Sequence, residues 1–199
     1  LKDLQLSIKP GEKVAIIGES GSGKSPLLKA LREQQADQVA WCPQDPGLVP
    51  MLNGLHNIYM GQLDQHHFLQ NLKQLIHPGR QIKQEIELIT QKLGINDQLY
   101  MACEQLSGGQ QQRISIARAI YSNKSIFLGD EPVSALDEYQ TDEILNLIAQ
   151  HFETLIISLH DIELALKYCQ RIIALKDRQI LFDKPSSSLS TTELAQVYQ

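Results

Sequence analysis

The stretch Val14-Ala15-Ile16-Ile17-Gly18-Glu19-Ser20-Gly21-Ser22-Gly23-Lys24-Ser25 decides the fold of this chain. Its apolar start is typical of a short strand that is covered on both faces. A glycine-rich loop follows, and the leucines at 27, 28 and 31 then have the spacing of a helix. Strand, glycine loop and helix in this order open an α/β unit, so we predict an α/β fold.

The loop between this strand and this helix fits the pattern G-x-x-x-x-G-K-[ST]. Glycines let the backbone turn so tightly that successive N–H groups converge on phosphate oxygens. The following helix adds the partial positive charge of its N-terminus. Lys24 is placed to reach the β- and γ-phosphates of a nucleotide, and the Ser25 hydroxyl to ligate Mg²⁺. We therefore predict a nucleotide site at Gly18, Glu19, Ser20, Gly21, Ser22, Gly23, Lys24 and Ser25.

An apolar strand that ends in two acidic residues, Asp130 and Glu131, is the second chemical feature. At the carboxyl end of a parallel strand, Asp130 would face the phosphate loop, where it can hold Mg²⁺ through water. Glu131 is placed to orient and polarise an attacking water. Many strands end in acids, so this feature indicates a metal and water site only in combination with the phosphate loop.

A third feature is the segment Leu106-Ser107-Gly108-Gly109-Gln110, which precedes a predicted helix. A serine and two glycines at a helix N-terminus form a second concavity of N–H groups that suits an anion. Such a segment alone is common in turns. Two phosphate-binding concavities in one chain are uncommon, and they raise the question of which phosphate the second one binds.

Together these segments resemble the nucleotide-binding domain of ATP-binding cassette (ABC) transporters, in the order of that family and over nearly the whole chain. The corresponding segments are the Walker A loop at 18–25, the Q-loop glutamine Gln44, the signature L-S-G-G-Q at 106–110, the Walker B strand at 126–131, the D-loop at 134–137 and the switch histidine His160.

The resemblance implies an ATPase that hydrolyses ATP to ADP and phosphate with Mg²⁺. Two domains would pair head to tail around two ATP molecules. The N–H groups of the signature segment 106–110 of one domain would bind the γ-phosphate held by the phosphate loop of the other. The implied catalytic residues are Glu131, His160, Gln44 and Lys24. Nucleotide contacts would also come from Pro26, Ser107, Gly108, Gly109 and Gln110, and Mg²⁺ ligands from Ser25, Gln44 and Asp130.

Two positions and one stretch depart from the pattern of the family. Pro26 stands where a threonine is usual, and it offers neither an N–H nor a hydroxyl to the α-phosphate; we therefore predict weakened nucleotide binding. The stretch between Lys24 and Gln44 is shorter than usual, which predicts a reduced antiparallel β-subdomain. Gly129 replaces a bulkier apolar residue before Asp130, and the sequence offers no reason for that change.

The fold expected from the resemblance is a P-loop NTPase core with a mainly parallel sheet and an inserted α-helical subdomain. We assign residues 1–44 and 105–199 to the core and 45–104 to the insertion, where Ile82, Ile86, Ile89 and Leu93 have helical spacing. Further along, we expect a strand at 4–8, helices near 107–122, 138–150 and 161–169, strands at 125–128 and 154–158, a hairpin at 171–182 and a capping box at 190–193.

Composition limits the partners of this chain. It has 199 residues and a formal net charge of −5, which disfavours a nucleic-acid partner. It has no run of about 18 apolar residues that could span a bilayer. Its three cysteines lie far apart without a C-x-x-C pair, so we expect neither a disulfide framework nor a zinc site.

The leading hypothesis is the ATP-binding subunit of a membrane transporter, at the cytoplasmic face of the inner membrane. Its partners would be a transmembrane permease subunit and, indirectly, a periplasmic or lipoprotein solute-binding protein. Residues 48–58 and 164–172 resemble ATPases of phosphonate importers. The alternatives are a soluble ABC-type ATPase in repair or translation, and a GTPase or small-molecule kinase. The long coiled coil typical of repair members and the Asn-Lys-x-Asp run of GTPases are both missing from the sequence.

Overall fold

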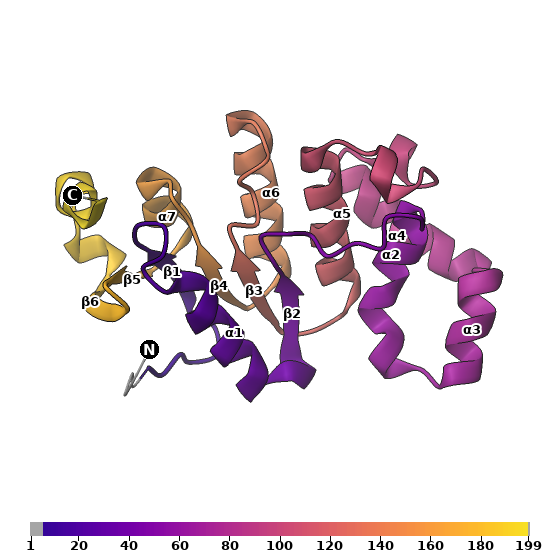
Figure 1. The fold of residues 1–199 in the computed structure, drawn as a ribbon, viewed down its shortest axis with the longest axis horizontal. Coiled ribbons are helices and arrows are strands. Elements are labelled where there is room, and N and C mark those ends of the chain that lie inside the picture. Colours follow the sequence, from indigo (N-terminus) through magenta and orange to yellow (C-terminus); the bar gives the residue numbers. More distant parts are fainter. Residues whose placement is uncertain (1–5, 199) are drawn as a thin grey trace. The chain divides into compact units, whose positions relative to one another are not determined.

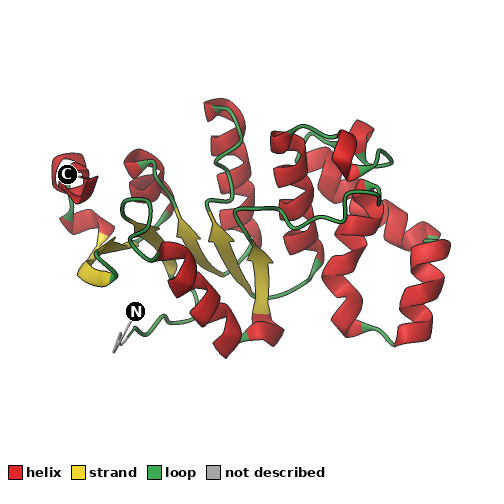
Figure 2. Cartoon of the chain, in the orientation of Figure 1, coloured by secondary structure: helices red, strands yellow, loops and turns green. Residues whose placement is uncertain are grey.

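A computed structural model describes residues 6–198 of the chain. The chain forms two compact units, one from residues 1–44, 125–134 and 138–199 and the other from residues 45–124 and 135–137. Among the described residues, no helix is both long and apolar enough to cross a membrane. The first unit is built on a sheet and the second on helices (Figures 1 and 2).

The sheet of the first unit has six strands in the order β2-β3-β4-β1-β5-β6. All neighbouring strands run parallel except the pair β5 and β6, which is antiparallel. The strands are β1 (Lys13–Ile17), β2 (Val39–Cys42), β3 (Ile126–Asp130), β4 (Thr154–Ser158), β5 (Arg171–Lys176) and β6 (Gln179–Pro185). This mixed, mostly parallel sheet confirms the predicted α/β fold.

Both faces of the parallel strands are buried, which explains their continuous apolar sequences. One set of alternating side chains, including Val14, Ile16 and Leu128, packs with Leu27 and Leu28 of helix α1 (Lys24–Gln34). Side chains of the opposite parity face the other way, and there the Phe127 ring meets Phe152, which follows α6 (Glu138–His151), at a centroid distance of 5.1 Å. Helix α7 (Ile162–Tyr168) packs against α6 and β1, and α8 (Thr191–Ala195) follows.

The N-terminal segment differs from the expectation. Of the strand expected at residues 4–8, positions 4 and 5 lie outside the described residues, and residues 6–8 do not form a strand. Leu6 and Ile8 instead pack, partly buried, against the core beside α1. Within residues 6–198, β5 and β6 form the only antiparallel pair of strands, so the antiparallel part of the fold is indeed small.

The second unit contains α2 (Gly54–Tyr59), α3 (Phe68–Ile76), α4 (Arg80–Lys92) and α5 (Gly108–Tyr121). Helices α2, α4 and α5 pack against one another around buried residues that include Leu55, Ile86 and Ile114. Because α5 packs with these helices, it is grouped with residues 45–104. The boundary that we expect after residue 104, between the helical insertion and the ATPase core, stays a prediction.

The structure gives a physical reason for Gly129 in β3. A Cβ atom at this position would lie 2.7 Å from Phe127 Cε1, 2.8 Å from Pro132 Cγ and 3.1 Å from Ile157 Cγ2. The Phe127 ring therefore occupies the space that a larger side chain at 129 would need. Glycine is required here because of this close approach within the core.

We expect Gly129→Ala to lower the free energy of unfolding by about 1–3 kcal/mol, because the added methyl group overpacks the core. Thermal unfolding should show this as a lower Tm. Gly108→Ala is the matched control, since a Cβ atom at Gly108 meets nothing within 4 Å. In Gly129→Ala with Phe127→Leu, part of the loss should be recovered. A wild-type Tm for Gly129→Ala would contradict this account.

Candidate nucleotide site

The phosphate loop between β1 and α1 has a backbone that depends on glycine. Gly18 has a φ of 149° and Gly23, which caps the N-terminus of α1, a φ of 109°. A Cβ atom at Gly18 would lie 2.3 Å from the carbonyl oxygen of Leu175 in β5. The loop thus lies directly against β5 of the sheet. Its glycine conformations fit the tight turn that the sequence predicts for a segment whose N–H groups converge on a phosphate.

Lys24 is almost fully buried at the start of α1. Its Nζ donates hydrogen bonds to the carbonyl oxygens of Gly18 at 2.8 Å and Glu19 at 3.2 Å. Burial lowers the pKa of Lys24, while the carboxylates of Glu131 and Asp130 act in the opposite direction. A cation in this setting favours an anionic ligand, because a ligand phosphate would compensate part of the lost hydration.

The loop also contains a buried hydroxyl, the Oγ of Ser22, that has no hydrogen-bond partner among residues 6–198. Buried polar groups in native structures nearly always have a partner. An unpaired hydroxyl inside a phosphate-binding loop fits a site that is completed by a bound anion.

Two backbone and side-chain contacts fix the position of Glu131. Its N–H donates to Ser158 Oγ at 2.8 Å, and this hydroxyl donates to Asp130 Oδ1 at 2.9 Å. Ser158 is placed to do so because it lies opposite Asp130 in the register of β3 and β4. Glu131 has a φ of 50°, an uncommon conformation for a non-glycine residue. The chain therefore turns sharply at the end of β3 and directs the Glu131 side chain away from the strand.

The Glu131 carboxylate lies among three side chains that the sequence predicts to act with it. Oε1 is 2.5 Å from His160 Nε2 and 3.9 Å from Lys24 Nζ, and Oε2 accepts a hydrogen bond from Gln44 Nε2 at 3.0 Å. The Glu131 side chain is 14% exposed and that of His160 49% exposed, so the carboxylate is the more enclosed partner of this pair. A carboxylate held in this way can accept a proton from a water beside a phosphate.

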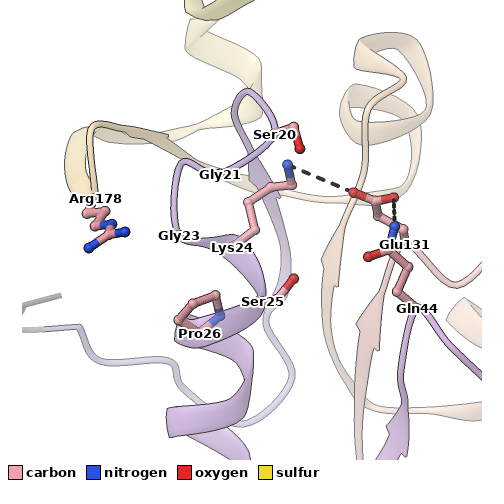
Figure 3. A pocket seen from close by; sticks show the side chains of 9 residues that line it. All are labelled: Ser20, Gly21, Gly23, Lys24, Ser25, Pro26, Gln44, Glu131 and Arg178. Atoms are coloured by element: carbon pink, nitrogen blue, oxygen red, sulfur yellow. Dashed lines mark hydrogen bonds and ion pairs between the residues drawn. The ribbon is translucent and has the colours of Figure 1, made fainter. Parts of the chain in front are cut away.

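A cavity of about 470 Å³ lies between the phosphate loop and Glu131 (Figure 3). Its lining consists of Ser20, Gly21, Gly23, Lys24, Ser25, Pro26, Gln44, Glu131 and Arg178. All of these except Arg178 are predicted site residues. Gly18, Glu19 and Ser22 belong to the loop without lining the cavity, and Asp130 is buried beside it.

The residues predicted to bind Mg²⁺, Ser25, Gln44 and Asp130, offer hard oxygen donors. No group of three or more His, Cys, Asp or Glu side chains that could hold a metal occurs within residues 6–198. A metal here would rely on the Ser25 hydroxyl, on the Gln44 amide, on Asp130 through water and on phosphate oxygens of the nucleotide. This donor set suits Mg²⁺, which keeps several waters and binds substrate phosphates.

The signature residues belong to the other unit and start helix α5. Ser107 is the N-cap: its Oγ accepts from the Gln110 N–H at 3.3 Å, and its own N–H donates to Gln110 Oε1 at 2.9 Å. Gly109 approaches the carbonyl oxygen of Ala135 closely, since a Cβ atom there would lie 2.8 Å from it. Ser107 and Gly108 are exposed. The N-terminus of this 14-residue helix is therefore open to an anion.

Sequence reasoning missed two residues near this site, Ser158 and Arg178. Ser158 could have been found, because it ends the strand before His160 and would pair in register with the Walker B strand. Arg178 gives no such signal. The sequence predicts a hairpin at 171–182, but only the folded chain shows that its turn at Asp177 and Arg178 contacts the phosphate loop.

Comparison with known proteins identifies the family. A family model described as "ABC transporter" matches residues 1–134. The phosphonates import ATP-binding protein PhnC of Pseudomonas entomophila (strain L48) is 36% identical, over 100% of this chain and 85% of that protein. The PhnC protein of Fusobacterium nucleatum is 31% identical, over 100% of this chain and 92% of that protein.

Solved structures of ABC cassettes have the same fold as this chain. The dimeric structure of the bacterial ABC transporter cassette MJ0796 has a TM-score of 0.81 and 28% identity, covering 94% of this chain and 90% of that one. The same cassette bound to ADP and Pi in a post-hydrolysis state has a TM-score of 0.74 and 27% identity, with the same coverage. CbiO1 of Clostridium perfringens, part of the transporter complex cbiONQ, shares the fold with a TM-score of 0.74 at 21% identity, covering 98% of this chain and 86% of that one.

Pro26 lines the cavity in the first turn of α1, where proline costs no intrahelical hydrogen bond. We expect Pro26→Thr to lower the Kd for ATP about threefold to tenfold, because an N–H and a hydroxyl become available to the nucleotide. Isothermal titration calorimetry measures this change. Pro26→Ala restores only the N–H and should give an intermediate Kd. An unchanged Kd for Pro26→Thr would refute the idea that Pro26 weakens binding.

Proposed function

The chain belongs to the ABC transporter family as an ATP-binding subunit with ATPase activity, and from this premise we propose that it powers import of phosphonate-like small anionic solutes. The cargo is inferred from relatives named as phosphonate import proteins, which match the full length of this chain at 36% identity. The observation that carries the proposed chemistry is the Glu131 carboxylate beside the phosphate loop, in contact with His160 and Gln44.

In this proposal Lys24 binds the β- and γ-phosphates of ATP, and the N–H groups of residues 18–25 surround them. Glu131 takes a proton from the attacking water as the water oxygen bonds to the γ-phosphorus. The bond from the γ-phosphorus to the bridging oxygen breaks, and ADP leaves with that oxygen. His160 holds Glu131 in position at 2.5 Å.

Mg²⁺, when bound, would neutralise charge on the phosphates. Ser25 and Gln44 line the cavity and are the proposed ligands, with Asp130 acting through a water. In Figure 3 the amide oxygen of Gln44 lies on the side of Ser25, while its nitrogen points to Glu131. Gln44 would thereby connect the metal region with the Glu131 carboxylate.

We place a second cassette opposite the first, in a head-to-tail pair. Ser107, Gly108, Gly109 and Gln110 of one copy would bind the γ-phosphate held by the phosphate loop of the other. The exposed Ser107 and Gly108 and the open space beside Gly108 support this role, as does the dimeric form of a similar cassette. This pairing would answer what the second anion-binding concavity is for.

The proposed transporter contains a transmembrane permease subunit, which this chain contacts at the cytoplasmic face of the inner membrane, and a periplasmic or lipoprotein solute-binding protein. The helical unit would contact the permease. The net charge of −5 supports contact with another protein rather than with anionic lipid headgroups or a nucleic acid.

We expect Glu131→Gln to bind ATP and form a stable pair of cassettes while hydrolysing ATP at least about 100-fold more slowly, because the general base is lost. Light scattering reports the mass with and without ATP, and phosphate release reports turnover. Glu153→Gln is the matched control, since Glu153 is an exposed carboxylate away from the cavity. Turnover of Glu131→Gln near the wild-type rate would contradict the role of Glu131. A wild-type ATPase rate that is strictly first order in protein at low protein concentration would contradict the paired mechanism.

The cargo is tested on the transporter complex. The full-length protein, co-purified with its membrane partner and placed in proteoliposomes with the matching solute-binding protein, should show ATP hydrolysis that methylphosphonate stimulates and sulfate does not. Lack of response to phosphonates and phosphate esters would remove the cargo assignment. Failure of any membrane protein to co-purify would favour the soluble ABC-type ATPase instead.

A further inference from the structure

Arg178 lines the cavity but belongs to none of the sequence motifs. It lies in the two-residue turn between β5 and β6. Its backbone N–H donates to the carbonyl oxygen of Ser22 in the phosphate loop, at 3.2 Å. The hairpin turn is thus attached to the loop, and this attachment fixes the point from which the arginine side chain extends.

The backbone of this turn is unusual for the residue that it carries. Asp177 has a φ of 51° and Arg178 a φ of 63°. Two-residue hairpin turns with positive φ at both positions favour Asn, Asp and Gly. A residue with a Cβ atom and a long side chain, such as arginine, strains the backbone at position 178. Strained backbone often occurs where a side chain has a function.

The Arg178 side chain is exposed and directed toward the phosphate loop (Figure 3). No hydrogen bond or ion pair of its guanidinium is found within the described part of the chain. Arg171 of the same hairpin differs, because Asp183 and Glu12 hold its guanidinium. The charge of Arg178 is therefore free to interact with a ligand in the cavity.

Arg178 and Glu131 lie on opposite sides of the phosphate loop, with Gly23 and Pro26 between them (Figure 3). If Lys24 and Glu131 mark the γ-phosphate, as in the proposed function on which this inference rests, Arg178 lies toward the α-phosphate. Pro26, at that end, lacks both an N–H and a hydroxyl. We propose that Arg178 binds the α-phosphate of the nucleotide and replaces the contacts that Pro26 does not provide.

Arginine suits this role chemically. Its planar guanidinium offers paired N–H donors that match two oxygens of one phosphate, and it stays charged at all physiological pH values. A phosphate contact does not depend on the base. The contribution of Arg178 should therefore be the same for ATP and GTP, whereas stacking of the guanidinium on adenine would make it differ.

The test is the Kd of ATP and of GTP, measured by isothermal titration calorimetry on the full chain. Arg178→Gly removes the guanidinium and places at 178 the residue that accepts the positive φ most readily. It should raise both Kd values about tenfold, in keeping with the loss of a charge-assisted hydrogen bond. Arg178→Lys should lie between wild type and Arg178→Gly.

Lys184→Gln is the matched control, because it removes one positive charge from the same hairpin at a residue that does not line the cavity. Its Kd values should equal those of wild type. Unchanged Kd values for Arg178→Gly would overturn the proposal, and so would a loss for ATP without a loss for GTP. If the wild type itself does not bind ATP, the nucleotide site fails rather than the role of Arg178.

A double-mutant cycle tests the replacement of Pro26. With Pro26→Thr in place, Arg178→Gly should raise the Kd for ATP less than it does in the wild type, because threonine then supplies α-phosphate contacts. Residues that share a partner show such coupling, whereas independent residues add. Equal effects of Arg178→Gly in both backgrounds would overturn the idea that the arginine compensates for the proline.

Discussion

The position of the Glu131 carboxylate is the constraint on which the rest of the site depends. Parallel strands β3 and β4 bring Asp130 and Ser158 into register, and Ser158 Oγ accepts from the Glu131 N–H and donates to Asp130. This bridge holds the chain where it turns out of the sheet. Gln44, His160 and Lys24 then approach Glu131 from three other segments of the same unit.

The sheet makes this arrangement possible because its parallel strands end at one edge. β1 leads into the phosphate loop, β2 into Gln44, β3 into Glu131 and β4 into His160. Each functional side chain therefore follows a buried strand, and packing of the strands fixes the distances between the side chains. Gly129 shows how tight this packing is, because a methyl group there would meet Phe127, Pro132 and Ile157.

The nucleotide cavity combines a standard phosphate loop with two unusual residues. Pro26 offers neither an N–H nor a hydroxyl donor at one end of the cavity. Arg178 brings a positive charge to the same side from the β5–β6 turn. The Arg178 N–H also bonds to the loop at Ser22. The hairpin, which packs against β1 as an extension of the sheet, thereby becomes part of the proposed nucleotide site.

The sequence by itself determined the motifs, the α/β class and most elements, because these depend on local spacing. The strand predicted at 154–158 has those bounds, and the predicted capping box of Ser190 and Glu193 begins α8. Only the tertiary structure decided three further features. These are the replacement of a strand by packed Leu6 and Ile8, the need for glycine at 129, and the placement of Arg178 beside the phosphate loop. The packing of Leu6 and Ile8 and the placement of Arg178 depend on atoms from segments far apart in the chain, and the spacing of residues along a sequence carries no information about such contacts. The crowding at Gly129 comes from its near neighbours Phe127 and Pro132 and from Ile157 of β4, and it arises only from how these side chains pack in the folded core.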